Sequence, residues 1–558
     1  MDFLKKKDFL YPFFGCIILF LAILPNYYSF GNLLYDCGRE FLVPKAVMEG
    51  ELPVKEIFLS YFPLSYQINA LLFKIFSSSF DTLRITGVFS SFIIVIFIYH
   101  ISRFFTDEKK SFLISIIVPF ITMFNVSYLF NYVMGYSYAF IYASAILFIS
   151  VYFVLLYLKE NKTLFLYLSY FLLGICFALK IEFIFLIVPY FLLVLYKKIK
   201  IKEVIISFLL FLLPVFISFF ILFVGGFNFY DFISYIEFLK SFLNSKILKY
   251  YNSTVFVSNP ILWIKYNLSS FLSFIIPFLL CGLILYFPVK KEKEILYRIL
   301  FVFLFVLFFV LSIVKGEFCS IELFSFLCIT TLFIVYHSYK TKNIPLLFLS
   351  LVQLFLCMRF NFIYTGNYSA YILPAGLVVN LIFFSSIVKN KIFNKLFLSF
   401  MILTALVNVI YYSTSQVLFS RYEIKTNKGK FLISDAKTGF TIKETINFLD
   451  KLKDKKVLIL PDGAMLNYLS DTKTDLRYYQ LLPNHIEILG EEKIVNDLNN
   501  DKPDYIMLTN VDYSIYGTPL FCRDFGNKIC NFVFENYDYI KTFANDKNFV
   551  IGVYKVKE

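Results

Sequence analysis

Apolar runs recur through most of this sequence and restrict its fold more than any other feature. A helix of about 20 apolar residues crosses the ~30 Å hydrocarbon core of a bilayer. Of the 558 residues, 59% are hydrophobic and 16% are charged, too few charges to cover so much apolar surface in water. We therefore predict a polytopic α-helical membrane protein with about 13 transmembrane helices. The predicted spans lie near residues 9–29, 84–102, 111–124, 137–157, 163–179, 182–196, 204–224, 265–288, 298–314, 321–337, 344–357, 368–388 and 396–417.

The Lys and Arg residues between these runs predict how the helices are oriented. The basic N-terminus precedes the first run, and no small-residue cleavage site follows that run, which favours an uncleaved span over a secretory signal. With a cytoplasmic N-terminus, every second loop is basic, as the positive-inside rule requires. The C-terminal tail then lies outside the plasma membrane. The basic residues of the predicted inner loops are Arg103, Lys109 and Lys110; Lys159 and Lys162; Lys197, Lys198, Lys200 and Lys202; Lys290, Lys291 and Lys293; Lys340 and Lys342; Lys389, Lys391 and Lys395.

Two predicted outer segments are long, at residues 26–83 and 225–265. The first contains Tyr61-Phe62-Pro63-Leu64-Ser65-Tyr66, followed by an apolar stretch to Phe76 that is too short to span a bilayer. We predict a helix lying in the membrane interface over this stretch, with its aromatic residues at the level of the headgroups.

The composition changes after Arg421, where polar and charged residues become common. We predict a transmembrane domain at 1–420 and a small extracytoplasmic α/β domain at 421–558. Its predicted strands are 456–460, 505–508 and 549–556, and its predicted helices are 441–453, 489–499 and 524–536. The tail has no Gly-rich phosphate loop, so nucleotide binding has no support. Pairing of Cys522 with Cys530 is left open.

Unusual ionisable residues gather at the predicted outer ends of the helices. A pump or an ion-coupled transporter would carry carboxylates near mid-bilayer, whereas one charged interface suits a lipid-linked substrate whose polar head lies there. Three isolated histidines, His100, His337 and His485, argue against a zinc site. The outer charged residues are Asp36, Arg39 and Glu40; Lys180 and Glu182; Lys315, Glu317 and Glu322; and Arg359.

The sequence Tyr35-Asp36-Cys37-Gly38-Arg39-Glu40, just after the first span, resembles the polyprenyl-phosphate-dependent glycosyltransferases of the GT-C type. This group includes bacterial aminoarabinose and mannosyl transferases. Further similar positions are Pro44 and Gly50; Tyr61-Phe62-Pro63-Leu64 and Arg84; Lys180-Ile181-Glu182; and Arg359 with Tyr368 and Pro374. Asn367 replaces a frequent His, and 131–136 lacks a second acidic residue that many relatives carry. The acceptor class and the metal requirement are therefore left open, and no other cofactor is expected.

The resemblance implies an inverting transfer of a sugar from a polyprenyl phosphate to an extracytoplasmic lipid, glycan or protein. Asp36 is then the catalytic base, and its alternative role is a helix cap. The resemblance also implies that Lys180, Arg359 and Arg39 bind the donor phosphate, although each is equally consistent with an interfacial anchor or an ion-pair partner. The supporting residues are Glu40, Glu182, Tyr61 and Tyr368. Glu40 either raises the pKa of Asp36 or is a solvated residue.

Two other functions fit the sequence. One is a transporter or flippase for lipid-linked saccharides, and the other is a membrane-anchored scaffold whose tail binds a partner. Neither nucleic acid binding nor a particular sugar or oligomeric state is indicated.

Overall fold

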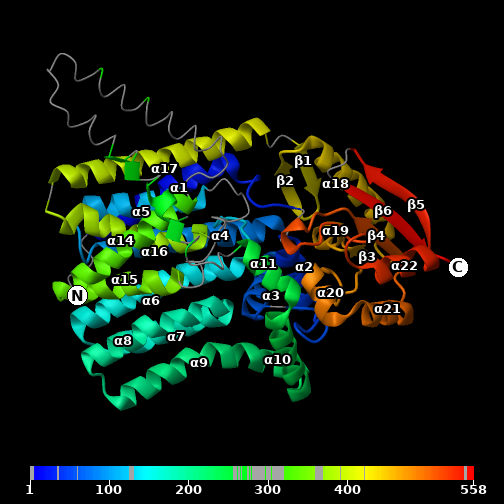
Figure 1. Ribbon diagram of the computed structural model, residues 1–558, viewed down its shortest axis with the longest axis horizontal. Coiled ribbons are helices and arrows are strands. Elements are labelled where there is room, and N and C mark those ends of the chain that lie inside the picture. Colours follow the sequence, from blue (N-terminus) through cyan, green and yellow to red (C-terminus); the bar gives the residue numbers. More distant parts are fainter. Residues whose placement is uncertain are drawn as a thin grey trace.

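The computed structural model describes residues 6–33, 37–59, 61–124, 131–255, 320–357, 369–389, 391–419, 422–545 and 549–558, with short stretches between 261 and 303. Figure 1 shows the long apolar helices stacked side by side on the left and the strands gathered on the right. The predicted spans near 265–288 and 298–314 lie largely outside the described residues.

Most described helices coincide with the predicted spans. By length and composition, six are able to cross a membrane, and three further apolar helices are shorter. The chain is therefore a multi-pass membrane protein, whereas the number of about 13 spans stays a prediction. The helices are α1 (Lys6–Ile23), α4 (Phe80–Ser102), α5 (Glu108–Met123), α6 (Tyr138–Glu160), α7 (Thr163–Leu179), α8 (Ile187–Lys197), α9 (Ile201–Val224), α14 (Ser320–Lys340), α15 (Ile344–Cys357), α16 (Ser369–Ile382) and α17 (Lys391–Phe419).

Two features of these helices are typical of membrane proteins: small residues where helices pack closely, and apolar side chains on the exposed faces. A Cβ on Gly174 of α7 would lie 2.1 Å from the carbonyl oxygen of Phe211 in α9, so the two helices approach at backbone distance only because this residue is glycine. On the outer face of α9, Phe216, Phe220 and Val224 are exposed, as lipid-facing side chains are.

Four helices occupy the two long segments predicted to lie outside. They are α2 (Cys37–Met48), α3 (Leu64–Phe76), α10 (Phe229–Asn244) and α11 (Lys246–Val255). The predicted interfacial helix over 61–76 is present as α3, which buries Tyr66 and Phe73 and exposes Leu71, Ile75 and Phe76. This amphipathic face suits a helix in the membrane interface.

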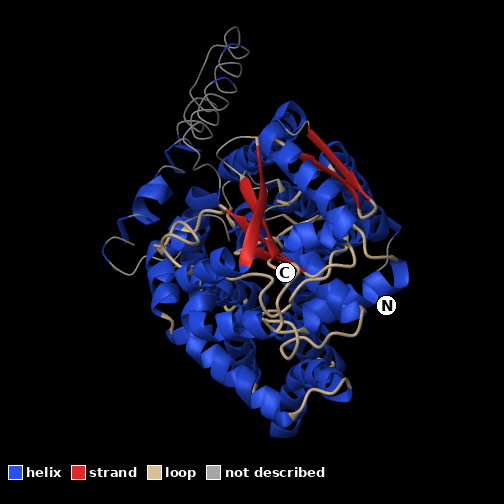
Figure 2. Ribbon diagram, turned by 90° about the vertical axis from the view of Figure 1, so that its right-hand side faces the viewer, coloured by secondary structure: helices blue, strands red, loops and turns tan. Residues whose placement is uncertain are grey.

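The tail contains a two-stranded and a four-stranded sheet, which Figure 2 shows as separate groups of strands among helices. The hairpin joins β1 (Tyr422–Thr426) to β2 (Gly429–Ile433). The larger sheet has the order β3-β4-β6-β5, with β3 and β4 parallel and the other pairs antiparallel. Its strands are β3 (Val457–Leu460), β4 (Tyr505–Thr509), β5 (Tyr537–Ala544) and β6 (Val550–Val556), and the tail helices are α18 (Ala436–Leu449), α19 (Ala464–Ser470), α20 (Pro483–Leu489), α21 (Glu491–Asn500) and α22 (Asn527–Asn536).

The tail predictions were right for three strands and three helices, and they missed the strands β1, β2 and β5 and the helices α19 and α20. The pairing left open by the sequence is present, because Cys522 and Cys530 form a disulfide.

The tail rests directly on α2. A Cβ on Gly38 would lie 2.4 Å from the backbone nitrogen of Met465 in α19, so glycine is needed for this approach. Asp471 binds Lys45 of α2 at 2.9 Å and Lys428 of the β1–β2 turn at 2.7 Å. The first turn of α2 is therefore enclosed between the apolar helices and the tail.

Candidate active site around Tyr61

Arg39 lies in the first turn of α2 and is 4% exposed. Its guanidinium carbon lies 4.6 Å from the ring centroid of Tyr61 and 5.0 Å from that of Tyr136. The hydroxyl groups of these two tyrosines are 2.8 Å apart, which holds both rings against the cation. Such cation–π contacts partly replace the water that a buried guanidinium loses.

Lys180 reaches the same ring from a different part of the chain. It follows α7 with an extended backbone, φ −149° and ψ 118°, before a 3₁₀ helix begins at Ile181. Its Nζ lies 4.4 Å from the centroid of Tyr61 and 5.0 Å from that of Phe140, and the residue is 7% exposed. Two buried cations therefore share one tyrosine ring.

Each cation has a carboxylate neighbour, but neither ion pair is tight. The Nε of Arg39 and Oε1 of Glu40 are 3.9 Å apart, and Lys180 and Glu182 are 3.8 Å apart. Both distances exceed hydrogen-bond length. Each carboxylate therefore attracts its neighbouring cation without accepting a hydrogen bond from it.

Glu40 is 1% exposed, so the alternative prediction that this residue is solvated is wrong. Its Oε2 accepts a hydrogen bond from the backbone N–H of Tyr138 at 3.1 Å, at the start of α6. A helix N-terminus stabilises a carboxylate through its free N–H groups and its dipole. Glu40 thereby joins α2 to α6 and helps to hold Arg39 in place.

The tail contributes two residues that sequence reasoning missed. Nη1 of Arg39 donates to Oε1 of Gln480 at 3.3 Å, and Nε2 of Gln480 donates to Oδ2 of Asp462 at 2.8 Å. The only signal available in the sequence is the position of Asp462, directly after a buried strand, where α/β proteins commonly place binding residues.

His485 supports the Gln480 segment. Its Nδ1 lies 3.2 Å from the carbonyl oxygen of Gln480, and since that oxygen only accepts, Nδ1 carries the proton. Burial lowers the pKa of His485 to about 4, so the imidazole is neutral at physiological pH.

Tyr371 of α16 connects another part of the chain to the site. Its hydroxyl donates to the carbonyl oxygen of Tyr136 at 2.5 Å, and its ring stacks on Phe140 at 4.9 Å. Tyr132 and Tyr138, two further tyrosines near Tyr136 in the sequence, are 1% exposed and are therefore core residues.

Five predicted site residues therefore come together: Arg39, Glu40, Tyr61, Lys180 and Glu182. Three others, Asp36, Arg359 and Tyr368, lie outside the described residues. Within the described part of the chain, no three His, Cys, Asp or Glu side chains are grouped as metal ligands.

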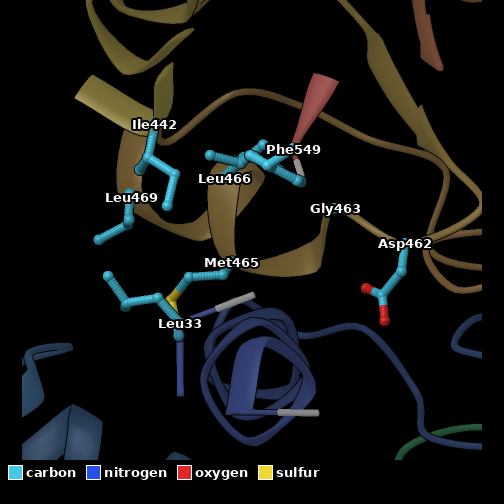
Figure 3. A pocket seen from close by; sticks show the side chains of 8 residues that line it. All are labelled: Leu33, Ile442, Asp462, Gly463, Met465, Leu466, Leu469 and Phe549. Carbon is cyan, nitrogen blue, oxygen red and sulfur yellow. The ribbon is translucent and has the colours of Figure 1, made fainter. Parts of the chain in front are cut away.

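A pocket lies where the tail meets the segment before α2 (Figure 3). Its wall is apolar, with Leu33 and Met465 among the lining residues, except at Asp462. Figure 3 shows the Asp462 carboxylate standing apart from these apolar side chains. Asp462, whose carboxylate binds Gln480, is thus also one of the residues that line this pocket.

Comparisons with known proteins bear on the fold. No protein-family model and no curated protein matches the chain. Among solved structures, ArnT from Cupriavidus metallidurans bound to undecaprenyl phosphate aligns over 98% of this chain and 97% of that chain, with a TM-score of 0.52 and 9% identity. The Archaeoglobus fulgidus oligosaccharyltransferase in complex with Zn and sulfate aligns over 89% and 67%, with a TM-score of 0.51 and 10% identity.

A third structure, AglB from Archaeoglobus fulgidus with an inhibitory peptide and a dolichol-phosphate, covers 99% of this chain and 74% of that chain, with a TM-score of 0.51 and 10% identity. ArnT and AglB are glycosyltransferases of the GT-C type. At such low identity the likeness concerns the fold. This multi-pass chain has the fold of the GT-C membrane glycosyltransferases, as the resemblance in its sequence predicted.

Proposed function

We propose that this protein is an inverting membrane glycosyltransferase that moves a sugar from a polyprenyl-phosphate donor to an extracytoplasmic acceptor. The acceptor is a lipid, a glycan or a protein of the cell envelope. The N-terminus is cytoplasmic, and the tail lies on the side of the membrane where transfer takes place. The fold shared with ArnT and AglB, whose structures hold undecaprenyl phosphate and dolichol-phosphate, supports a lipid-phosphate donor.

The observation that carries the proposal is the pair of buried cations against Tyr61. Arg39 and Lys180 come from α2 and from the end of α7, and both ion pairs to their acidic neighbours are long. Among the described residues, Nε of Arg39 has no hydrogen-bond acceptor. A buried donor without an acceptor is costly unless a ligand supplies one. A phosphate oxygen fits this need in charge and in geometry.

Glycosyl transfer from a lipid phosphate requires few catalytic groups. A lipid phosphate leaves readily, so the transfer needs cations that stabilise its developing charge and a base that accepts the acceptor's proton. In this proposal Arg39, Lys180 and Arg359 bind the phosphate. Asp36, three residues before Arg39, is the base, and a single displacement inverts the anomeric centre. Glu40, Glu182, Tyr61 and Tyr368 support these groups.

The test is mass spectrometry of envelope lipids and glycans from cells with the protein, without it, and with Asp36→Asn. Loss of one sugar modification in both the deletion and the variant is the expected result. A lipid-linked saccharide that accumulates on the cytoplasmic side of the deletion strain, with transfer retained by Asp36→Asn, would identify a flippase instead. Envelope components unchanged by the deletion would contradict both activities.

A further inference from the structure

Gln480 and Asp462 of the tail form a hydrogen-bonded chain that ends on Arg39. The donor–acceptor distances are 3.3 Å from Arg39 to Gln480 and 2.8 Å from Gln480 to Asp462. The three residues are 4%, 3% and 9% exposed, so water competes little for these bonds. A side-chain amide held at both ends keeps one orientation.

Asp462 determines which end of the amide faces Arg39. A carboxylate only accepts hydrogen bonds, so it binds the amide N–H group and leaves the amide oxygen for the guanidinium, which only donates. The reversed amide would set two donors against each other at Arg39 and two acceptors at Asp462. The negative charge of Asp462 thus acts on Arg39 through the orientation of Gln480.

The backbone segments that carry these two residues lie beside the end of the four-stranded sheet, where Asp462 and Gln480 form an isolated antiparallel bridge. Asp462 follows β3, and Oγ1 of Thr509, at the end of the parallel strand β4, donates to the Asp462 carbonyl oxygen at 3.3 Å. The N–H of Leu481 donates to the carbonyl oxygen of Pro461 at 2.7 Å. The carboxyl edge of the sheet therefore holds Gln480 against α2.

We infer that Gln480, oriented by Asp462, is a positioning residue for Arg39, so that the tail completes the donor-phosphate site. This inference rests on the proposed function, because it assigns Arg39 to the donor phosphate. A guanidinium presents its N–H groups in one rigid plane, and fixing Nη1 on Gln480 fixes the direction of Nε. The Nε group is the one without an acceptor among the described residues.

The test measures undecaprenyl phosphate binding to the purified full-length protein in detergent. Gln480→Leu removes the acceptor for Arg39, and we expect binding to weaken about tenfold, the effect of one hydrogen bond to a charged group. The matched control is Asp471→Asn, which loosens the same tail from α2 through Lys45, near the opposite end of that helix. The control should bind like the wild type.

A charge swap gives the sharper readout. Gln480→Glu sets two carboxylates together, and Asp462→Asn lets the amide turn its N–H group toward Arg39, so each single variant should bind weakly. The double variant Gln480→Glu/Asp462→Asn restores an acceptor for Arg39 and a donor–acceptor pair behind it, and it should recover most of the affinity.

Each contrary result has its own meaning. Equal losses in Asp471→Asn and Gln480→Leu, or unchanged binding in Gln480→Leu, would overturn the positioning role while leaving the proposed function intact. Failure of the double variant to recover would also overturn it, provided that its thermal stability matches that of the single variants. Wild-type protein that does not bind undecaprenyl phosphate would overturn the proposed function and, with it, this inference.

Discussion

The hydroxyl groups of Tyr61 and Tyr136 lie 2.8 Å apart, and both rings lie against the guanidinium of Arg39. The hydrogen bond joins the segment between α2 and α3 to the segment before α6, two parts of the chain that are 75 residues apart. Tyr61 also touches Lys180, so one ring organises both cations of the candidate site.

Replacement of Tyr61 should separate the roles of its ring and its hydroxyl group. Tyr61→Phe keeps both cation–π contacts and should reduce kcat/KM only a few-fold. Tyr61→Leu removes both contacts, each worth about 0.5–2 kcal/mol, and should reduce kcat/KM at least tenfold. Transfer assays in proteoliposomes measure this, with Tyr230→Leu, at a 77% exposed tyrosine of α10, as the control. Equal losses of kcat/KM in the Phe and Leu variants would show that the aromatic ring of Tyr61 does not contribute to transfer.

Lys180→Gln should weaken donor use more than it weakens folding. The variant removes a buried positive charge from the proposed phosphate site, and we expect kcat/KM to fall about 10- to 100-fold, mainly through KM for the donor. Lys55→Gln is the control, because Lys55 lies between α2 and α3 and donates to the carbonyl oxygen of Gly226. A KM that does not change in Lys180→Gln would exclude this lysine from donor binding.

Asp36→Asn should abolish transfer and spare donor binding. A general base contributes about 10²–10⁴-fold to a rate, and an amide cannot accept the proton. Single-turnover transfer and undecaprenyl phosphate binding, measured on the same preparation, distinguish the two effects. Glu49→Gln, at a 53% exposed carboxylate after α2, is the control. Residual transfer near the wild-type rate would assign the base to another group.

The proposed orientation predicts which cysteine substitutions are labelled in intact cells. A membrane-impermeant maleimide should label Glu558→Cys in the tail and should fail to label Lys162→Cys until the membrane is opened. Both side chains are well exposed, 95% and 67%, so accessibility in the folded protein does not differ much. The disulfide between Cys522 and Cys530 should be oxidised in cells, as extracytoplasmic cysteines are. The reverse labelling pattern would invert the topology.

Stability should depend on pH through His485. Its pKa falls from the usual 6.5 to about 4 because the ring is buried. Between these pH values the unfolded chain binds a proton there and the folded chain does not. Protonation of the unfolded chain therefore lowers the free energy of unfolding as the pH falls from 6.5 toward 4, by about 3 kcal/mol in all. Above pH 6.5 this effect is absent.

Thermal unfolding in detergent, followed from pH 7 to pH 4, measures this effect. His485→Asn keeps a donor for the Gln480 carbonyl oxygen and has no proton to bind, so its unfolding temperature should fall less steeply. Parallel curves for the two proteins would contradict the assignment.

Several elements were predictable because their signal is local. The strand Val457–Leu460 is a short run of buried apolar residues, and α9 is a long one, so neighbouring residues alone indicate each element. The strand Tyr537–Ala544 was missed because it is an edge strand with most of its side chains exposed. Its apolar alternation is therefore weak, and its pairing with β6 decides its conformation.

Part of the candidate site was also predictable. Charged residues at the ends of apolar runs are costly and therefore informative, which is why Arg39, Lys180 and Glu182 were identified from the sequence. The roles of Asp36, Arg359 and Tyr368 stay predictions. The burial of Glu40 was not foreseen, because its N–H partner at the start of α6 is 98 residues away.

The sequence by itself determined that this chain is a membrane protein. It also determined the positions of most of its helices and the charged residues at their ends. Apolar length and charge position carry that information one segment at a time. Only the tertiary structure decided that Arg39 and Lys180 share the ring of Tyr61 and that Gln480, 441 residues beyond Arg39, holds the guanidinium. Such contacts depend on how separate helices and the tail pack together, and no local pattern records that packing.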